Sequence, residues 1–174
     1  MHFGVNLNNR EALIAPNYDV SALLDLSATV ERLGFDSIWV GDSLFSKPRY
    51  EPLSLLSAIS QRTKTAQLGT ACLVTATRDP LYLALEWATL DVISGGRTIL
   101  GACMGNAGME DGVRREYAAV GLDHKQRAWI FEEGLEVLRE LWTNGEVDFH
   151  GKHFDYDNVA FHSGTEPAPI LPLQ

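Results

Sequence analysis

The sequence predicts an α/β protein in which parallel strands alternate with helices. Short apolar segments typical of buried strands recur along the chain, and between them lie longer segments with apolar residues at helical spacing. Glycine and proline stand where several of these helices should end or begin. Strands of this kind are usually covered by helices on their outer side. On the pattern alone, a doubly wound sheet and a barrel both remain open.

The expected elements follow from this pattern. Strands are predicted over 2–7, 37–40, 67–74 and 98–104, and helices over 19–33, 52–64, 81–93 and 125–143. Asp19 is a suitable N-cap for the first helix, and Gly34 is a suitable stop. Pro52 opens the second helix, and Pro80 follows Asp79 at the start of the third. A glycine-rich, charged loop is expected before the last helix.

The chain after the last helix departs from this rhythm. Apolar and polar residues alternate on both sides of Gly151, which predicts a small antiparallel hairpin over 146–162. The end of the chain is rich in proline. We therefore expect one truncated domain with four β/α units over 1–145, a hairpin insertion over 146–162, and a tail or the start of a fifth strand over 163–174.

Composition excludes several classes of partner. The 174 residues are 45% hydrophobic, enough for a sizeable core, and carry a net charge of −9. Nucleic acid and anionic membranes are poor partners for such a chain. Neither a membrane span nor a signal peptide is visible, so a cytoplasmic protein is expected. Cys72 and Cys103 lie in apolar segments, which favours reduced, buried thiols.

Three strings carry a family resemblance over nearly the whole chain. The first is ATLD at 88–91 followed by SGGR at 94–97, between the third helix and the fourth strand. The second is FDSIWV at 35–40, and the third is EVL at 136–138 with LWT at 141–143. The chain resembles the luciferase-like monooxygenases, which implies the first four or so units of a TIM-type (β/α)₈ barrel. A complete barrel needs about 250 residues.

The resemblance also implies an activity. Members of this family bind reduced FMN, or the deazaflavin coenzyme (F-420), at the carboxyl ends of the barrel strands. The leading expectation is an oxidoreductase or monooxygenase that uses reduced FMN and dioxygen on a small organic substrate. One alternative is an oxidoreductase dependent on the deazaflavin coenzyme. Another is a catalytically silent half-barrel that serves as a binding module.

Candidate site residues follow from their position just beyond each strand, where barrel enzymes place their active sites. Asn6 and Asn8 are candidates for substrate contact, although asparagines in loops commonly serve turns. Asp42 is a candidate for cofactor contact or catalysis, and its alternative role is a cap. Ser43 is a candidate for substrate contact. It stands where deazaflavin-using relatives often carry histidine, and its hydroxyl cannot replace an imidazole in proton transfer, which favours FMN.

Further candidates follow strands three and four. The resemblance implies a non-proline cis peptide between Ala71 and Cys72, behind the central ring of the flavin. Met104, Gly105 and Asn106 are expected to line the cofactor pocket. Cys103 stands where bacterial luciferase alpha chains carry a reactive thiol, but no neighbouring cation in the sequence would lower its pKa, so an ordinary thiol is the better interpretation.

Two other clusters are interpreted as structural. Gly95, Gly96 and Arg97 precede the fourth strand and therefore lie on the stability face, where they end a helix. The hairpin carries His150, His153 and His162 with Asp148, Asp155 and Asp157. Alternate hairpin residues face opposite sides, so we expect no metal site there. A half-barrel also leaves an open edge, which we expect a homo-oligomer to cover.

Overall fold

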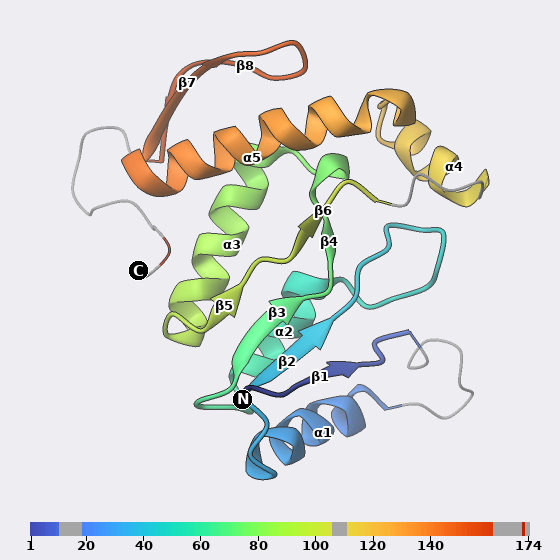
Figure 1. Ribbon diagram of the computed structural model, residues 1–174, viewed down its shortest axis with the longest axis vertical. Helices are drawn as coiled ribbons and strands as arrows, with labels where there is room; N and C mark the ends of the chain where they lie inside the picture. The colour runs from blue at the N-terminus through green and yellow to red at the C-terminus, as the bar shows by residue number, and fades with distance from the viewer. Residues whose placement is uncertain (11–18, 106–110, 162–171, 173–174) are drawn as a thin grey trace. The chain divides into compact units, whose positions relative to one another are not determined.

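The computed structural model describes residues 1–10, 19–105, 111–161 and 172 (Figure 1). They form two compact units. Unit 1 comprises Met1–Val74 and Ile93–Ala102, and unit 2 comprises Thr75–Val92 and the chain from Cys103 onward. Among the described residues, no helix combines the length and the apolar character that a membrane span requires.

Unit 1 contains a four-stranded parallel sheet. Its strands are β1 (Gly4–Leu7), β2 (Ser37–Val40), β3 (Gln67–Thr70) and β5 (Thr98–Ile99), and they lie side by side in this order (Figure 1). The register places Leu7 beside Val40 and Val40 beside Thr70. Because the spatial order follows the chain order, the sheet winds in one direction, whereas a doubly wound sheet reverses. The sheet is thus the beginning of a barrel.

Two helices of unit 1 begin at the residues that the sequence indicated. Helix α1 (Val20–Arg32) is capped by Asp19, which accepts a hydrogen bond from Ser21 N at 2.9 Å. Helix α2 (Pro52–Ser60) has proline in its first turn and Glu51 as its N-cap. The prediction that this helix reaches residue 64 was wrong, because the backbone turns after Ser60 and its last carbonyls bond elsewhere.

The two faces of the sheet differ sharply. Ile38, Val40 and Leu68 are fully buried, on the face that α1 and α2 cover. On the other face, the Trp39 indole lies over Gly4 and Gly69, so a Cβ added at either glycine would collide with it. The indole N–H donates to Ser37 Oγ at 2.8 Å. Gly4 and Gly69 lie on the two strands that flank β2. The Trp39 indole therefore fills the space that these glycines leave on the inward face of the sheet.

Strands three and four are each interrupted, where the sequence predicted continuous strands. The chain leaves β3 at Thr70 and resumes as β4 (Leu73–Val74), and after β5 it resumes as β6 (Ala102–Cys103). β4 and β6 pair in a two-stranded sheet. Gly101 permits the close approach of the two chains here, since a Cβ at this position would collide with the Thr70 carbonyl oxygen.

The elements of unit 2 are mainly helical. They are η2 (Thr75–Thr77), most of α3 (Pro80–Ser94), α4 (Asp111–Ala119), η3 (His124–Gln126), α5 (Arg127–Asn144), β7 (Glu146–His150) and β8 (Asp155–Ala160). Helix α4 lies where a loop was expected, because its charged sequence shows only a short apolar pattern. Helix α5 ends at Gly145, whose φ of 75° is the left-handed conformation that glycine adopts easily.

The hairpin is confirmed, and it lies along α5 (Figure 1). Glu133 of α5 holds its tip, since the carboxylate accepts hydrogen bonds from Lys152 N, His153 N and Phe154 N at 3.0, 2.8 and 3.2 Å. Burial raises the pKa of Glu133, but these three bonds outweigh it and the pKa lies below its ordinary value. The predicted tail lies outside the described residues, apart from Pro172.

Candidate functional site

The break between β3 and β4 forms a backbone step at the carboxyl end of the sheet. The Ala71–Cys72 peptide bond is cis, as the resemblance implied. Ala71 N donates to Val40 O at 2.8 Å, and Leu73 N donates to Gly101 O at 2.7 Å. Ala71 is exposed and Cys72 is half-buried. The neighbouring strands therefore hold this step from both sides, while Ala71 stays open to a ligand.

Asp42 follows β2 and is bonded to the same step. Its Oδ2 accepts a hydrogen bond from Val74 N at 2.8 Å, across 32 residues of sequence. The capping role that the sequence analysis offered as the alternative is therefore present in the structure, although the capped group is distant in sequence. Asp42 is half-buried, so it lies beside the backbone step of Ala71 and Cys72 without being sealed from solvent.

Ser43 serves its own loop. Its Oγ lies 3.0 Å from Ser46 Oγ and accepts a hydrogen bond from Lys47 N at 3.0 Å. These contacts use the hydroxyl to shape the segment after β2. A serine in this setting positions the loop and supplies no group that titrates near neutral pH.

The asparagines near the end of β1 have different places and environments: Asn6 lies within the strand, and Asn8 and Asn9 follow it. Asn6 is exposed on the inward face of the sheet, and Asn8 Oδ1 accepts from Arg10 N at 3.2 Å, as an asparagine does in a turn. Asn9 is fully buried, and its side-chain amide donates to Gly41 O at 2.8 Å and to Tyr50 O at 3.2 Å. The sequence identified Asn6 and Asn8 as polar groups near the end of a strand, but the expectation that Asn6 lies beyond the strand was wrong, because β1 extends to Leu7.

Arg49 was missed by the sequence analysis. Its Nη1 donates to Asn9 Oδ1 at 2.8 Å, and the guanidinium packs against Gly41, where an added Cβ would meet it. A cation is thereby placed beside the end of β2. The only sequence signal is that Arg49 is one of two basic residues, with Lys47, in the loop after that strand, and such residues are too common in loops to be singled out.

Unit 2 contains the candidates that follow β5. Cys103 is half-buried, Met104 is 38% exposed, and Gly105 has a φ of 72°. Asn106 lies outside the described residues. Both cysteines of the chain are free thiols, but the expectation that they are buried was wrong, because Cys72 and Cys103 lie at strand ends and remain partly accessible.

Gly95, Gly96 and Arg97 are structural residues, as the sequence predicted. Gly95 and Gly96 both have a φ of 77° and end α3. The Arg97 guanidinium then donates to the carbonyl oxygens of Ser60, Thr63, Ala66 and Ser94 and to Thr63 Oγ1. It therefore ties together the chain ends that precede β3 and β5.

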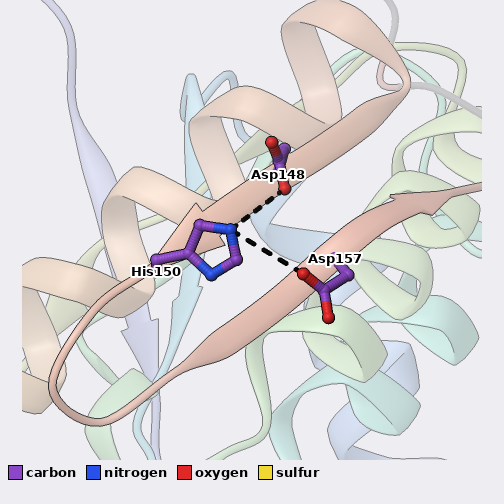
Figure 2. Close-up of side chains that lie close together, drawn as sticks. All are labelled: Asp148, His150 and Asp157. Carbon is purple, nitrogen blue, oxygen red and sulfur yellow. Dashed lines mark ion pairs between the residues drawn. The ribbon is translucent and has the colours of Figure 1, made fainter.

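The hairpin places a histidine among carboxylates (Figure 2). His150 Nε2 lies 3.4 Å from Asp148 Oδ1 and 3.8 Å from Asp157 Oδ1, while Nδ1 lies 2.7 Å from Asp155 Oδ1. The prediction that these residues face opposite sides was wrong for this set, since residues two apart on a strand share a face. The hydrogen bond that His150 Nδ1 donates to the Asp155 carboxylate, together with the charges of the nearby carboxylates, raises the pKa of His150. Asp148, His150 and Asp157 each bring one possible ligand atom to within 4.8 Å of the others, so the expectation of no metal site stays a prediction.

Comparisons with known proteins agree with this geometry. The family model described as luciferase-like monooxygenase matches residues 1–172. A curated F420-dependent glucose-6-phosphate dehydrogenase from Amycolatopsis mediterranei (strain U-32) is 32% identical over 157 residues, which cover 85% of this chain and 46% of that protein. The chain thus spans about half the length of the curated relatives it matches.

Solved structures show the same partial coverage. The monooxygenase RslO1 from Streptomyces bottropensis superposes with a TM-score of 0.75 at 27% identity, over 91% of this chain and 48% of its own. The oxygenating constituent of 3,6-diketocamphane monooxygenase from Pseudomonas putida, solved in complex with FMN, has a TM-score of 0.77 over 99% of this chain and 48% of its own. Its identity of 17% shows the fold alone.

Proposed function

Because the chain belongs to the luciferase-like monooxygenase family, we propose that it contributes the first half of a cofactor site in a flavin- or deazaflavin-dependent oxidoreductase. The observation that carries this proposal is the backbone step after β3. It lies at the carboxyl end of the sheet, it is hydrogen-bonded to both neighbouring strands, and Ala71 is exposed there. In a β/α barrel this is the end at which active sites form.

The residues of the chain have distinct tasks in this proposal. Ala71 and Cys72 form a rigid surface against which a planar ring system rests, and Asp42 keeps that surface in place through Val74. Asn6 is an exposed amide on the inward face and is available to a substrate. The bound cofactor supplies the redox chemistry, and the protein orients it and excludes water.

The deazaflavin coenzyme is the cofactor that we place first. Eight curated relatives that match over 83–90% of this chain are F420-dependent glucose-6-phosphate dehydrogenases at 27–34% identity. With this cofactor, the proposed reaction is hydride transfer to or from a small organic substrate. FMN with dioxygen is the second candidate. It is favoured by Ser43, because a hydroxyl that is used within its own loop cannot act as a general acid or base.

Titration of the purified chain with each cofactor tests the proposal. Fluorescence of FMN and of the deazaflavin coenzyme should change on binding, and the preferred cofactor should bind at least about tenfold more tightly. Asp42→Ala should weaken binding. Asp25→Ala is the matched control, since this carboxylate is 71% exposed and pairs with Arg62 on the surface at 3.6 Å. Failure of both cofactors to bind at high micromolar concentration contradicts the proposal and favours the silent binding module.

A further inference from the structure

The hairpin of unit 2 gathers four polar side chains on one face. Asp148 and His150 lie two residues apart on β7, and Asp155 and Asp157 lie two residues apart on β8. His150 is paired with Asp155, and residues directly opposite each other share a face, so all four side chains lie on the same side. Val147 of the other side is 1% exposed, because β7 packs against α5. The polar face is therefore the outer one.

A bulge in β8 brings Asp157 to Asp148. Two residues of β8, Asp157 and Asn158, lie opposite the single residue Asp148 of β7. Asn158 takes the extra place with a φ of 48°, a conformation that asparagine tolerates better than most residues. Asp148, His150 and Asp157 then converge, and each offers one possible ligand atom within 4.8 Å of the other two (Figure 2).

The distances around His150 Nε2 suit a metal ion better than hydrogen bonds. Nε2 lies 3.4 Å from Asp148 Oδ1 and 3.8 Å from Asp157 Oδ1. A hydrogen bond would bring these atoms to about 2.7–3.2 Å. Ligand atoms that each lie about 2.0–2.2 Å from a tetrahedral zinc ion are about 3.3–3.6 Å apart. The first distance matches this spacing, and the second requires only a small rotation of a side chain.

Asp155 prepares the ring of His150 for a metal ion. Its Oδ1 lies 2.7 Å from Nδ1 on the other side of the ring. An ionised carboxylate only accepts hydrogen bonds, so Nδ1 carries the proton and Nε2 of the neutral ring keeps its lone pair. A carboxylate behind the ring is the usual support of a metal-binding histidine, because it fixes the tautomer and the orientation of the ring. The lone pair of Nε2 is thus directed to the side of Asp148 and Asp157.

The local charge also favours a cation. Asp148 and Asp157 bring two carboxylates together across the strands, which costs free energy when both are ionised. A bound dication offsets this repulsion. The side chains of Asp148, His150 and Asp157 are 58%, 60% and 90% exposed, so an ion can enter from solvent and keep water at its remaining position.

We propose that Asp148, His150 and Asp157 bind a divalent transition-metal ion of the zinc type, through Nε2 of the histidine and one oxygen of each carboxylate. The nitrogen ligand favours such an ion over Mg²⁺ and Ca²⁺, which prefer oxygen ligands alone. The ion joins β7 to β8 on the outer face of the hairpin. This proposal replaces the sequence expectation of no metal site, whose premise fails because these side chains share a face. It does not depend on the proposed function, because no flavin or deazaflavin takes part.

Calorimetric titration with zinc tests the site in the full chain, without an affinity tag and after treatment with a chelator. Wild type should bind one ion per chain at this site, and His150→Ala should bind at least about tenfold more weakly. His2→Ala is the matched control, because His2 is 91% exposed and lies 3.2 Å from a single carboxylate, that of Asp36. It should bind within twofold of wild type. Absence of zinc binding in wild type, or equal binding in wild type and H150A, overturns the proposal.

Two further measurements distinguish the site from a simple cluster of charges. Asp157→Asn should weaken zinc binding at least about tenfold, whereas Asp25→Asn, which also removes an exposed carboxylate, should not. Long-range ¹⁵N–¹H spectra should show zinc on Nε2 of His150 while Nδ1 keeps its proton. Equal effects of D157N and D25N, an unshifted His150 ring, or Mg²⁺ that binds as tightly as zinc would each show that the carboxylates attract cations without a built site, and would overturn the proposal.

Discussion

The carboxylate of Asp42 accepts a hydrogen bond from the backbone N–H of Val74 at 2.8 Å. The bond joins the loop after β2 to β4, two residues beyond the Ala71–Cys72 step. A carboxylate that looks like a solvent-exposed loop residue in the sequence is thereby part of the framework of the candidate site.

Substitution of Asp42 should separate its hydrogen bond from its charge. Asp42→Ala leaves the Val74 N–H without this acceptor and should lower the free energy of unfolding by about 1–3 kcal/mol. Asp42→Asn keeps an oxygen acceptor and should recover at least half of that loss. Urea unfolding monitored by tryptophan fluorescence measures both. Equal losses in the two variants would show that charge, and not the hydrogen bond, is what matters.

Arg97 should resist replacement by lysine. Its guanidinium reaches four carbonyl oxygens and one hydroxyl, a set that a single ammonium group cannot satisfy. We expect Arg97→Lys to lower the free energy of unfolding by about 2–4 kcal/mol. Arg62→Lys is the control, because Arg62 is 52% exposed and its pair with Asp25 is worth little. A loss below about 0.5 kcal/mol in R97K would contradict the structural role of Arg97.

Two glycines should respond oppositely to alanine. At Gly101 a Cβ would collide with the Thr70 carbonyl oxygen, which is backbone and cannot move aside, so Gly101→Ala should cost about 1–3 kcal/mol. At Gly134, inside α5, the nearest atom to a Cβ is Phe154 Cε2 at 3.6 Å, an ordinary contact. Gly134→Ala should therefore stabilise by about 0.5–1 kcal/mol through helix propensity. Thermal unfolding of both variants tests this, and a stable G101A would show that the two strands separate easily.

Glu133 should make the stability of the hairpin depend on acid. Burial raises its pKa, but three backbone N–H bonds lower it by more, so the folded-state pKa lies below the ordinary 4.5. Its contribution is therefore complete above about pH 4.5 and is lost as the pH falls through the lowered pKa. Glu133→Gln should cost about 1–2 kcal/mol at pH 7, and the difference from wild type should shrink in acid.

Hydrogen exchange of the amides of Lys152, His153 and Phe154 reports on this contact directly. Exchange should accelerate in E133Q at pH 7. Glu132→Gln is the neighbouring control, because Glu132 is exposed on the same helix. Identical exchange in wild type and E133Q would rule out the proposed cap.

The sequence by itself determined the elements whose signals are local. Asp19 and Pro52 begin helices, Gly95 ends one, and alternation around Gly151 forms a hairpin, because each signal depends on backbone conformation or on the period of a single element. Periodicity alone could not distinguish a doubly wound sheet from a barrel, because both have the same local pattern of strands and helices. The family strings at 88–91 and 94–97 indicated the barrel.

Only the tertiary structure decided which polar residues act together. The partner of Asp42 lies 32 residues away, and the hydroxyl of Tyr117 reaches the main chain of strand four from a helix whose charged sequence suggested a loop. Two strands are interrupted where a continuous apolar run was expected, and at these breaks Gly101 lies so close to the Thr70 carbonyl that no Cβ would fit. Such contacts arise from the packing of segments distant in the chain, and no local pattern of residues encodes them.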